Sequence, residues 1–140
     1  MLKYAICESE ELVVVEYSGE LDFDTMVRYM HVIWAEPVLR SHFACICDLS
    51  LAQLQMSSQD MERLFFYIMS DERSLRGPCG LVIATPMETA LGFLFQNITQ
   101  KETTDGEAAV ALQIFSEWEN ACKFVNCAID RDALVWRIVE

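Results

Sequence analysis

The chain has 140 residues, of which 53% are hydrophobic, and carries a formal charge of −12. This length predicts one domain, spanning residues 1–140, whose core needs neither metal ions nor disulfides. The negative charge argues against a nucleic-acid partner, because binding to nucleic acid rests on Lys and Arg that neutralise phosphates. It argues against an anionic membrane surface for the same reason.

The six cysteines fall mostly within apolar segments, where a free cysteine behaves as a small hydrophobic residue. Free thiols are typical of the reducing cytoplasm, which is where we expect this protein. The N-terminal residues lack the apolar stretch of a signal peptide. No uncharged apolar run reaches the roughly 18 residues that a membrane helix needs.

Five apolar segments have the length and the boundaries of β-strands. They are residues 1–7, 12–18, 43–48, 79–84 and 108–115. An acidic turn joins the first two, which should pair as an antiparallel hairpin. Gly19 is expected to end the second strand. Helical connections should make the other three strands parallel, through right-handed crossovers.

Helical spacing of apolar residues follows the second and the third of these strands. Asp22 or Asp24 should cap the first helix, which must stop at Pro37. The second helix is expected from Ser58 to about Ser74.

Two further helices should begin at capping boxes, in which a hydroxyl and a carboxylate satisfy free backbone N–H groups at the helix start. These boxes are residues 85–88 and 116–119, and the last helix should run to about residue 126. A polar loop is expected at residues 101–107. The order of elements therefore predicts the α/β class, with a mixed, mostly parallel sheet, βαβ crossovers and an N-terminal antiparallel hairpin.

The sequence contains no recognisable catalytic or metal-binding motif. His31 and His42 are the only histidines, and neither has further ligands at the spacing of a zinc site. The chain has no nucleophile elbow, no P-loop and no dinucleotide-binding glycine loop. We therefore expect no enzymatic activity, no cofactor and no metal.

Two adjacent serines begin the second expected helix. Ser57 and Ser58 could cap it, which is worth about 1 kcal/mol. Alternatively they could carry a phosphate, because the field at a helix N-terminus favours an anion. Asp60 and Glu62 already use that field and would repel a phosphate. On the residues alone, capping is the favoured interpretation.

The run that begins at residue 48 resembles the SpoIIAA-like, or STAS, family of sulphate-transporter and anti-sigma-factor-antagonist domains. Antagonists have a strand that ends in D-L-S and then a D-S-S-G segment at a helix start. Residues 48–50 match the first element. Ser57 and Ser58 fall on the paired serines of the second, where Met56 replaces the acid and Gln59 replaces the glycine.

The later segments resemble a branch of stand-alone bacterial STAS-like proteins of unassigned role. CGLVIATP, METALGFLF and AAVALQIFSEWENACKFV follow the strand and helix order of that branch. The resemblance covers roughly residues 10–126, which leaves residues 127–140 as a C-terminal extension.

The resemblance implies a small non-enzymatic module that regulates or binds a protein partner, with Ser57, Ser58, Asp48 and Arg63 as its candidate site. The architecture is also loosely similar to that of lipid-carrying CRAL-TRIO domains, so a small apolar ligand is the alternative hypothesis. A third hypothesis is an antagonist-type switch, in which a kinase phosphorylates Ser57 or Ser58.

The chain has more large apolar residues than one core of this size is expected to cover. Trp34, Phe66, Tyr67 and Trp136 are the candidates for a contact between two copies. Apolar residues alternate in the tail at 134–139, which favours an extra strand that closes a sheet edge in its own chain or in a neighbour's. We therefore expect a homodimer.

Overall fold

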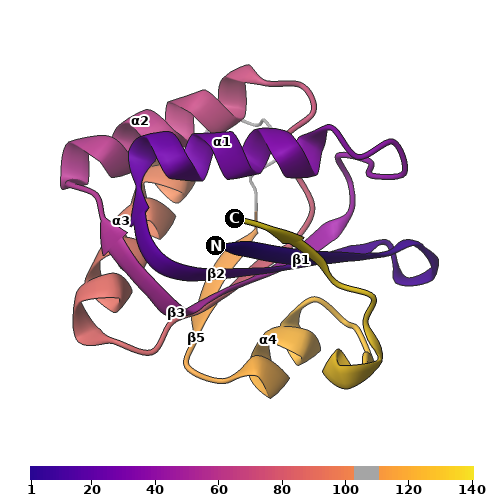
Figure 1. The fold of residues 1–140 in the computed structure, drawn as a ribbon. Coiled ribbons are helices and arrows are strands. Elements are labelled where there is room, and N and C mark those ends of the chain that lie inside the picture. The colour runs from indigo at the N-terminus through magenta and orange to yellow at the C-terminus, as the bar shows by residue number, and fades with distance from the viewer. Residues whose placement is uncertain (103–110) are drawn as a thin grey trace.

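A mixed sheet of six strands, in the order β5-β4-β3-β2-β1-β6, forms the centre of this computed structural model, which describes residues 1–102 and 111–140 (Figure 1). The strands are β1 (Leu2–Cys7), β2 (Leu12–Asp22), β3 (Ala44–Gln55), β4 (Cys79–Val82), β5 (Leu112–Phe115) and β6 (Arg137–Val139). The helices are α1 (Phe23–Trp34), α2 (Ser58–Ser70), α3 (Pro86–Glu102) and α4 (Trp118–Phe124), with short 3-10 turns η1 (Glu8–Glu10) and η2 (Arg131–Ala133).

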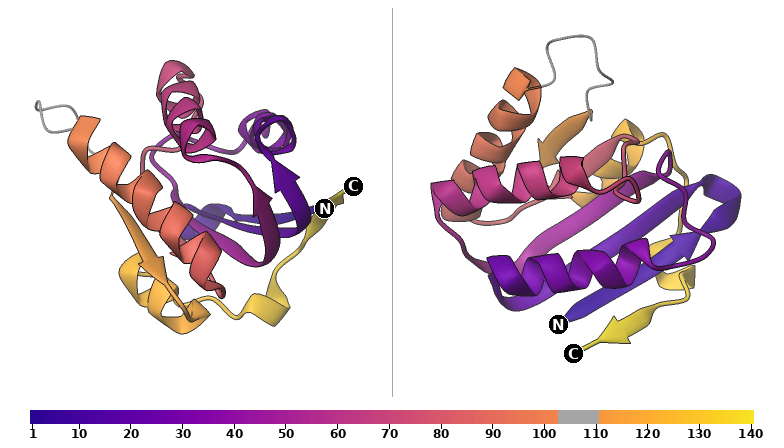
Figure 2. Two further views of the ribbon diagram at one scale, coloured as in Figure 1. Left: turned by 90° about the vertical axis from the view of Figure 1, so that its left-hand side faces the viewer. Right: turned by 90° about the horizontal axis from the view of Figure 1, so that it is seen from above.

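The pairing of the strands confirms the predicted α/β class. β1 and β2 form an antiparallel hairpin, whereas β2, β3, β4 and β5 are mutually parallel neighbours. Helices connect these parallel strands, as the crossover rule requires. β6 pairs antiparallel with β1 of its own chain, so the predicted tail strand exists and covers that sheet edge. The two termini consequently lie side by side (Figures 1 and 2).

Helices cover both faces of the sheet. α1, α2 and α3 lie on one face, where α1 and α2 run side by side over the strands, and α4 lies on the other (Figures 1 and 2). The apolar run of β2 fits this arrangement. Val13 and Val15 are buried under the three helices, whereas Leu12 and Val14 are buried on the α4 side. A strand buried on both faces has no room for alternating polar residues.

The two central strands are longer than predicted, and Gly19 does not end β2. It adopts a φ of +80°, which glycine tolerates, and pairing continues to Asp22 and Gln55. An irregularity precedes it: the pair Glu16–Asp48 is followed by Ser18–Leu51, so β3 contains an extra residue.

This bulge changes which residues of β3 face the core. Leu49 faces the three helices, and after the extra residue Ala52 and Leu54 do so as well. Leu51 is 69% exposed. The register shift therefore turns Ala52 and Leu54 towards the core and leaves Leu51 exposed, which explains why simple alternation did not identify this segment as a strand.

The observed starts of α1, α2 and α3 match those predicted from the sequence, and the start of α4 does not. Of the two candidate caps for α1, Asp22 is the one used, and its carboxylate accepts a hydrogen bond from the Thr25 N–H at 2.8 Å. α2 and α3 begin where expected, although the Glu88 side chain of the second box lies outside the described residues. The capping box at 116–119 is wrong: α4 begins at Trp118, with Glu117 as an N-cap that makes no side-chain hydrogen bond.

Several helix ends also differ from the expectation. α2 ends at Ser70 rather than near Ser74, because the chain turns at Asp71, whose carboxylate accepts a hydrogen bond from the Arg73 N–H. α4 ends at Phe124 rather than near residue 126. Residues 101–102 of the expected loop belong to α3, and residues 103–107 of it lie outside the described residues, as do residues 108–110 of the expected fifth strand.

Within residues 1–102 and 111–140, no helix combines the length and the apolar character required to cross a bilayer.

Candidate functional site

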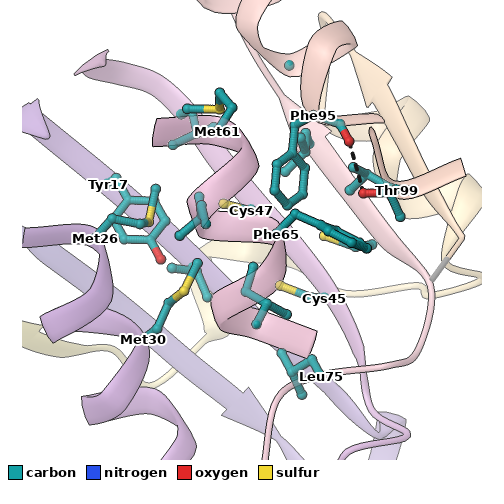
Figure 3. A pocket seen from close by; sticks show the side chains of 18 of the residues that line it. Tyr17, Met26, Met30, Cys45, Cys47, Met61, Phe65, Leu75, Phe95 and Thr99 are labelled. Carbon is teal, nitrogen blue, oxygen red and sulfur yellow. Dashed lines mark hydrogen bonds between the residues drawn. The ribbon is translucent and has the colours of Figure 1, made fainter. Parts of the chain in front are cut away.

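An apolar cavity of about 170 Å³ lies between the sheet and helices α1, α2 and α3 (Figure 3). Side chains of β2, β3 and β4 form its floor. The inward faces of the three helices form its roof, in which Phe65 of α2 and Phe95 of α3 meet edge to face, with ring centroids 6.4 Å apart. Every helix on this side of the sheet therefore borders one apolar space.

Cysteines make up part of the floor. Cys45 and Cys47 of β3 point into the cavity, because side chains alternate along a strand. Ile46 and Asp48 point to the opposite face. Cys79 of β4 is the direct partner of Cys45 in the sheet and adds a third thiol. These side chains are smaller than the Leu or Ile usual in a sheet core, so they leave space unfilled.

Methionines form part of the roof of the cavity and part of the wall at one of its ends. Among the described residues, five methionines line the cavity: Met26, Met30, Met56, Met61 and Met69. Methionine is unbranched and has three rotatable bonds, so it fits irregular spaces and adapts to different occupants. The wall of this cavity can therefore change shape at low cost.

Two hydroxyl groups border the cavity. That of Thr99 donates to the Phe95 carbonyl one turn earlier in α3, at 2.9 Å (Figure 3). Tyr17 of β2 is only 4% exposed, and no residue in 1–102 or 111–140 makes a hydrogen bond with its hydroxyl. Burial, followed by the nearby thiols of Cys47 and Cys45, raises the pKa of Tyr17 well above its usual value of 10.0. The phenol is thus a neutral donor.

The thiols of Cys45 and Cys47 are also neutral. A hydrogen bond with Cys79, followed by burial, raises the pKa of Cys45 well above 9.0. Burial likewise raises the pKa of Cys47. Since the thiolate is the reactive form, these cysteines are poor nucleophiles at neutral pH. No group of three or more potential metal ligands occurs among the described residues.

Close packing of α3 against the sheet bounds the cavity on one side. A Cβ atom at Gly92 would lie 2.7 Å from Ile83 Cδ1 and 3.2 Å from Ile114 Cδ1. Gly92 therefore allows the helix to approach β4 and β5 more closely than any side chain would permit.

The serines of the predicted phosphosite begin α2, and Ser57 caps it. Its hydroxyl accepts a hydrogen bond from the Asp60 N–H at 3.1 Å, and Asp60 Oδ2 accepts one from the Ser57 N–H at 3.0 Å. Backbone hydrogen bonding to Ser57 lowers the pKa of Asp60 below 3.8, so this carboxylate is charged at neutral pH. Ser58, the first residue of the helix, is exposed.

Asp48 does not join these serines. It points to the α4 face, where Arg131 Nη2 lies 2.6 Å from Oδ2. Arg63 is on α2, near Ser57 in the chain, with its guanidinium 4.0 Å from the Phe23 ring centre and 3.2 Å from Asp60. The structure thus places Ser57, Ser58 and Arg63 on one helix and Asp48 on the other side of the sheet.

The four predicted dimer residues do not form one surface. Phe66, which is 50% exposed, and Tyr67 line an open groove between α1 and α2, together with Arg63. Trp34 is buried below Tyr67 and stacks on it, with ring centroids 6.1 Å apart. Trp136 packs with the α4 side of the sheet, under Lys3.

Sequence reasoning missed both the cavity and Arg131. A signal for the cavity existed in the alternation of Cys45 and Cys47, together with the methionines at helical spacing. The role of Arg131 had no signal, since it lies 83 residues from its partner Asp48 and outside the region of family resemblance.

No protein-family model matches this chain, and no curated protein matches it. Among solved structures, it is similar to an uncharacterized protein from the DUF3478 family with a SpoIIAA-like fold, from Shewanella loihica PV-4. The two share 8% sequence identity at a TM-score of 0.47, over 81% of this chain and 83% of that one. At this TM-score the likeness carries no argument about fold family, activity, ligand or partner.

Proposed function

We propose that this protein is a non-enzymatic domain that binds a small apolar molecule in the cavity under α1, α2 and α3. The observation that carries the proposal is a space of about 170 Å³ with an almost wholly apolar wall. Engineered apolar cavities of roughly 150 Å³ stay dry and take up benzene. A molecule of similar size, with about six to nine non-hydrogen atoms, would match this volume.

The chemistry of the wall supports binding over catalysis. The thiols of Cys45 and Cys47 and the phenol of Tyr17 are neutral, and no charged side chain among the described residues lines the cavity. A general acid or base needs a pKa near the working pH, and a thiol nucleophile needs to be a thiolate. Cys45, Cys47 and Tyr17 meet neither requirement, so a bound molecule would be stabilised by burial of apolar surface.

The test is to titrate the protein with methylenecyclohexane, an uncharged hydrocarbon of suitable size, and to monitor binding by the NMR chemical shifts of the backbone amides. Saturable shifts at lining residues such as Met26, Met61 and Leu75 are expected. Cys47→Leu adds volume inside the cavity and should abolish binding. Leu51→Phe, on the same strand but at an exposed position, should leave binding unchanged. No binding by the wild type up to the solubility limit, or equal binding by Cys47→Leu, would refute the proposal.

A protein-interaction role is the second candidate, and the groove between α1 and α2 supports it. Arg63, Phe66 and Tyr67, which the sequence singled out for a partner or a second copy, all line this groove. A half-exposed Phe beside an Arg is typical of interface centres.

Sedimentation equilibrium at micromolar concentration tests self-association through the groove. A dimer that Phe66→Asp dissociates would support the hypothesis. Phe93→Asp is the matched control, because Phe93 is also 50% exposed but lies on α3. A monomeric wild type, or dissociation by both variants alike, would remove the groove as a dimer contact.

A phosphoswitch at Ser57 or Ser58 has less support. The Ser57 hydroxyl is already used in the α2 cap, and the charged Asp60 carboxylate lies beside it. A phosphate on Ser57 would remove the hydroxyl from the helix cap and would be repelled by the negative charge of Asp60. Incubation with a cognate kinase followed by intact mass measurement would decide the matter, with no added phosphate as the expected result.

A further inference from the structure

We infer that the ligand of this cavity is an uncharged molecule with a hydrogen-bond acceptor, such as a ketone, which accepts the hydroxyl proton of Tyr17. The inference rests on the proposed binding function and specifies its ligand class. Its basis is a buried donor that the protein itself leaves unused.

Tyr17 rises from β2 into the cavity, and its oxygen lies between the side chains of Met26 and Met30 (Figure 3). Its ring stacks on Tyr29 of α1, with centroids 6.1 Å apart and planes 27° apart, which fixes the direction of the hydroxyl. The residue is 4% exposed, and its hydroxyl makes no hydrogen bond within 1–102 or 111–140. The oxygen itself is not fully enclosed by protein atoms, and the residue borders the cavity, so an acceptor inside the cavity can reach this unused donor.

A single water molecule would not satisfy this site well. Buried water needs two to four polar partners. Around Tyr17 the cavity wall offers thioethers and the thiols of Cys45, Cys47 and Cys79, which are weak hydrogen-bonding groups. The phenol of Tyr29 also acts electrostatically on Tyr17, but Tyr29 does not line the cavity. The hydroxyl of Thr99 is engaged with the Phe95 carbonyl. An acceptor carried by an apolar ligand would satisfy the donor and fill the space together.

The acceptor should be neutral. Among the described residues no Lys, Arg or His lines the cavity, so a carboxylate or phosphate would be buried there without a counter-charge. The raised pKa keeps Tyr17 protonated across the physiological range, so it acts as a donor. These conditions favour ketones, aldehydes and esters with a short hydrocarbon body.

Cyclohexanone and methylenecyclohexane form a suitable probe pair, because a carbonyl oxygen in one replaces a CH₂ group in the other. Their dissociation constants would be measured by NMR on the wild type and on Tyr17→Phe, which lacks only the hydroxyl. The variant should bind cyclohexanone about tenfold more weakly, while its affinity for methylenecyclohexane should change less than about twofold.

A second readout does not depend on the variant. The ¹³Cζ signal of Tyr17 in wild-type protein should shift with cyclohexanone and not with methylenecyclohexane. Equal effects of Tyr17→Phe on both probes, or an unmoved ¹³Cζ signal, would overturn the acceptor inference while leaving apolar binding intact. Failure of both probes to bind the wild type would overturn the proposed function and the inference together.

Discussion

The guanidinium of Arg131 lies 2.6 Å from the carboxylate of Asp48 and joins the C-terminal segment to the middle of the sheet. The same group lies 2.9 Å from Glu16 Oε1 on the neighbouring strand β2 and 4.5 Å from the ring centre of Trp118 in α4. The side chain of Asp48 is only 8% exposed. The residue that aligns with the antagonist motif thus holds the tail against the sheet.

Replacing Arg131 with Ala should destabilise the fold by about 3 kcal/mol, because it leaves the buried Asp48 carboxylate without its counter-charge. Urea unfolding followed by circular dichroism measures the change. Arg63→Ala is the control, since its ion pair with Asp60 is exposed and should contribute less than about 1 kcal/mol. Equal effects of the two variants would mean that the Asp48 pair adds nothing beyond a surface contact.

Gly77 is held against the strand that precedes it along the chain. A Cβ atom there would lie 2.5 Å from the His42 carbonyl oxygen and closer still to that of Phe43. Gly77→Ala should therefore cost about 2–4 kcal/mol, because backbone must move. At Gly19 a Cβ would meet no atom within 4 Å, and only the positive φ opposes it, at about 1 kcal/mol. Thermal unfolding of both variants should show this order, and a reversed order would contradict the packing at Gly77.

The α2 cap predicts different roles for the adjacent serines. Ser57→Ala should lower stability by about 1 kcal/mol, because it removes the hydroxyl that accepts from the Asp60 N–H. Ser58→Ala should change stability by less than about 0.5 kcal/mol, since Ala is well tolerated at an exposed helical position. Guanidinium unfolding curves would distinguish them. A larger effect at Ser58 would show that the cap is misassigned.

Acid sensitivity should arise in part at Asp71. Hydrogen bonds from the Arg73 side chain and backbone lower the pKa of Asp71 from 3.8 to about 2. The folded pKa lies below the unfolded one, so the stabilisation is present above about pH 4 and is lost as the pH falls towards 2. In Arg73→Ala, carboxyl ¹³C titration should give an Asp71 pKa closer to 3.8. Arg63→Ala should leave it unchanged, and an unmoved value in Arg73→Ala would exclude Arg73 as the cause.

The order and type of the elements could be predicted because they follow from local patterns. Apolar runs predicted the parallel strands, and the tail strand followed from alternation near Trp136. The extension of β3 to Gln55 could not be predicted, because the bulge after Asp48 shifts the side-chain alternation and depends on pairing with a distant strand. The start of α4 was mispredicted for a similar reason. The backbone N–H of Ile83 donates a hydrogen bond to the carbonyl of Phe115 and keeps Phe115 in the sheet.

The candidate site was only partly accessible from the sequence. The cap at Ser57 follows from its position at a helix start, whereas Arg63 was named only as part of the candidate partner site that the resemblance implies. The alternation of Cys45 and Cys47 and the spacing of the methionines were a partial signal for the cavity, but its formation also depends on how α3 packs near Gly92, which no spacing along the chain encodes. The sequence did not single out Tyr17, because a sequence does not show which hydroxyl lacks a partner in the folded protein.

We propose above all that the cavity between the sheet and α1, α2 and α3 binds a small apolar molecule. Crystals of the protein pressurised with xenon test it most directly, because xenon enters dry apolar cavities of this size and has a strong anomalous signal. We expect a xenon site lined by Tyr17, Cys47, Met61 and Phe65, and none in crystals of Cys47→Leu. Wild-type crystals without xenon at these residues, or with ordered water filling the space, would contradict it.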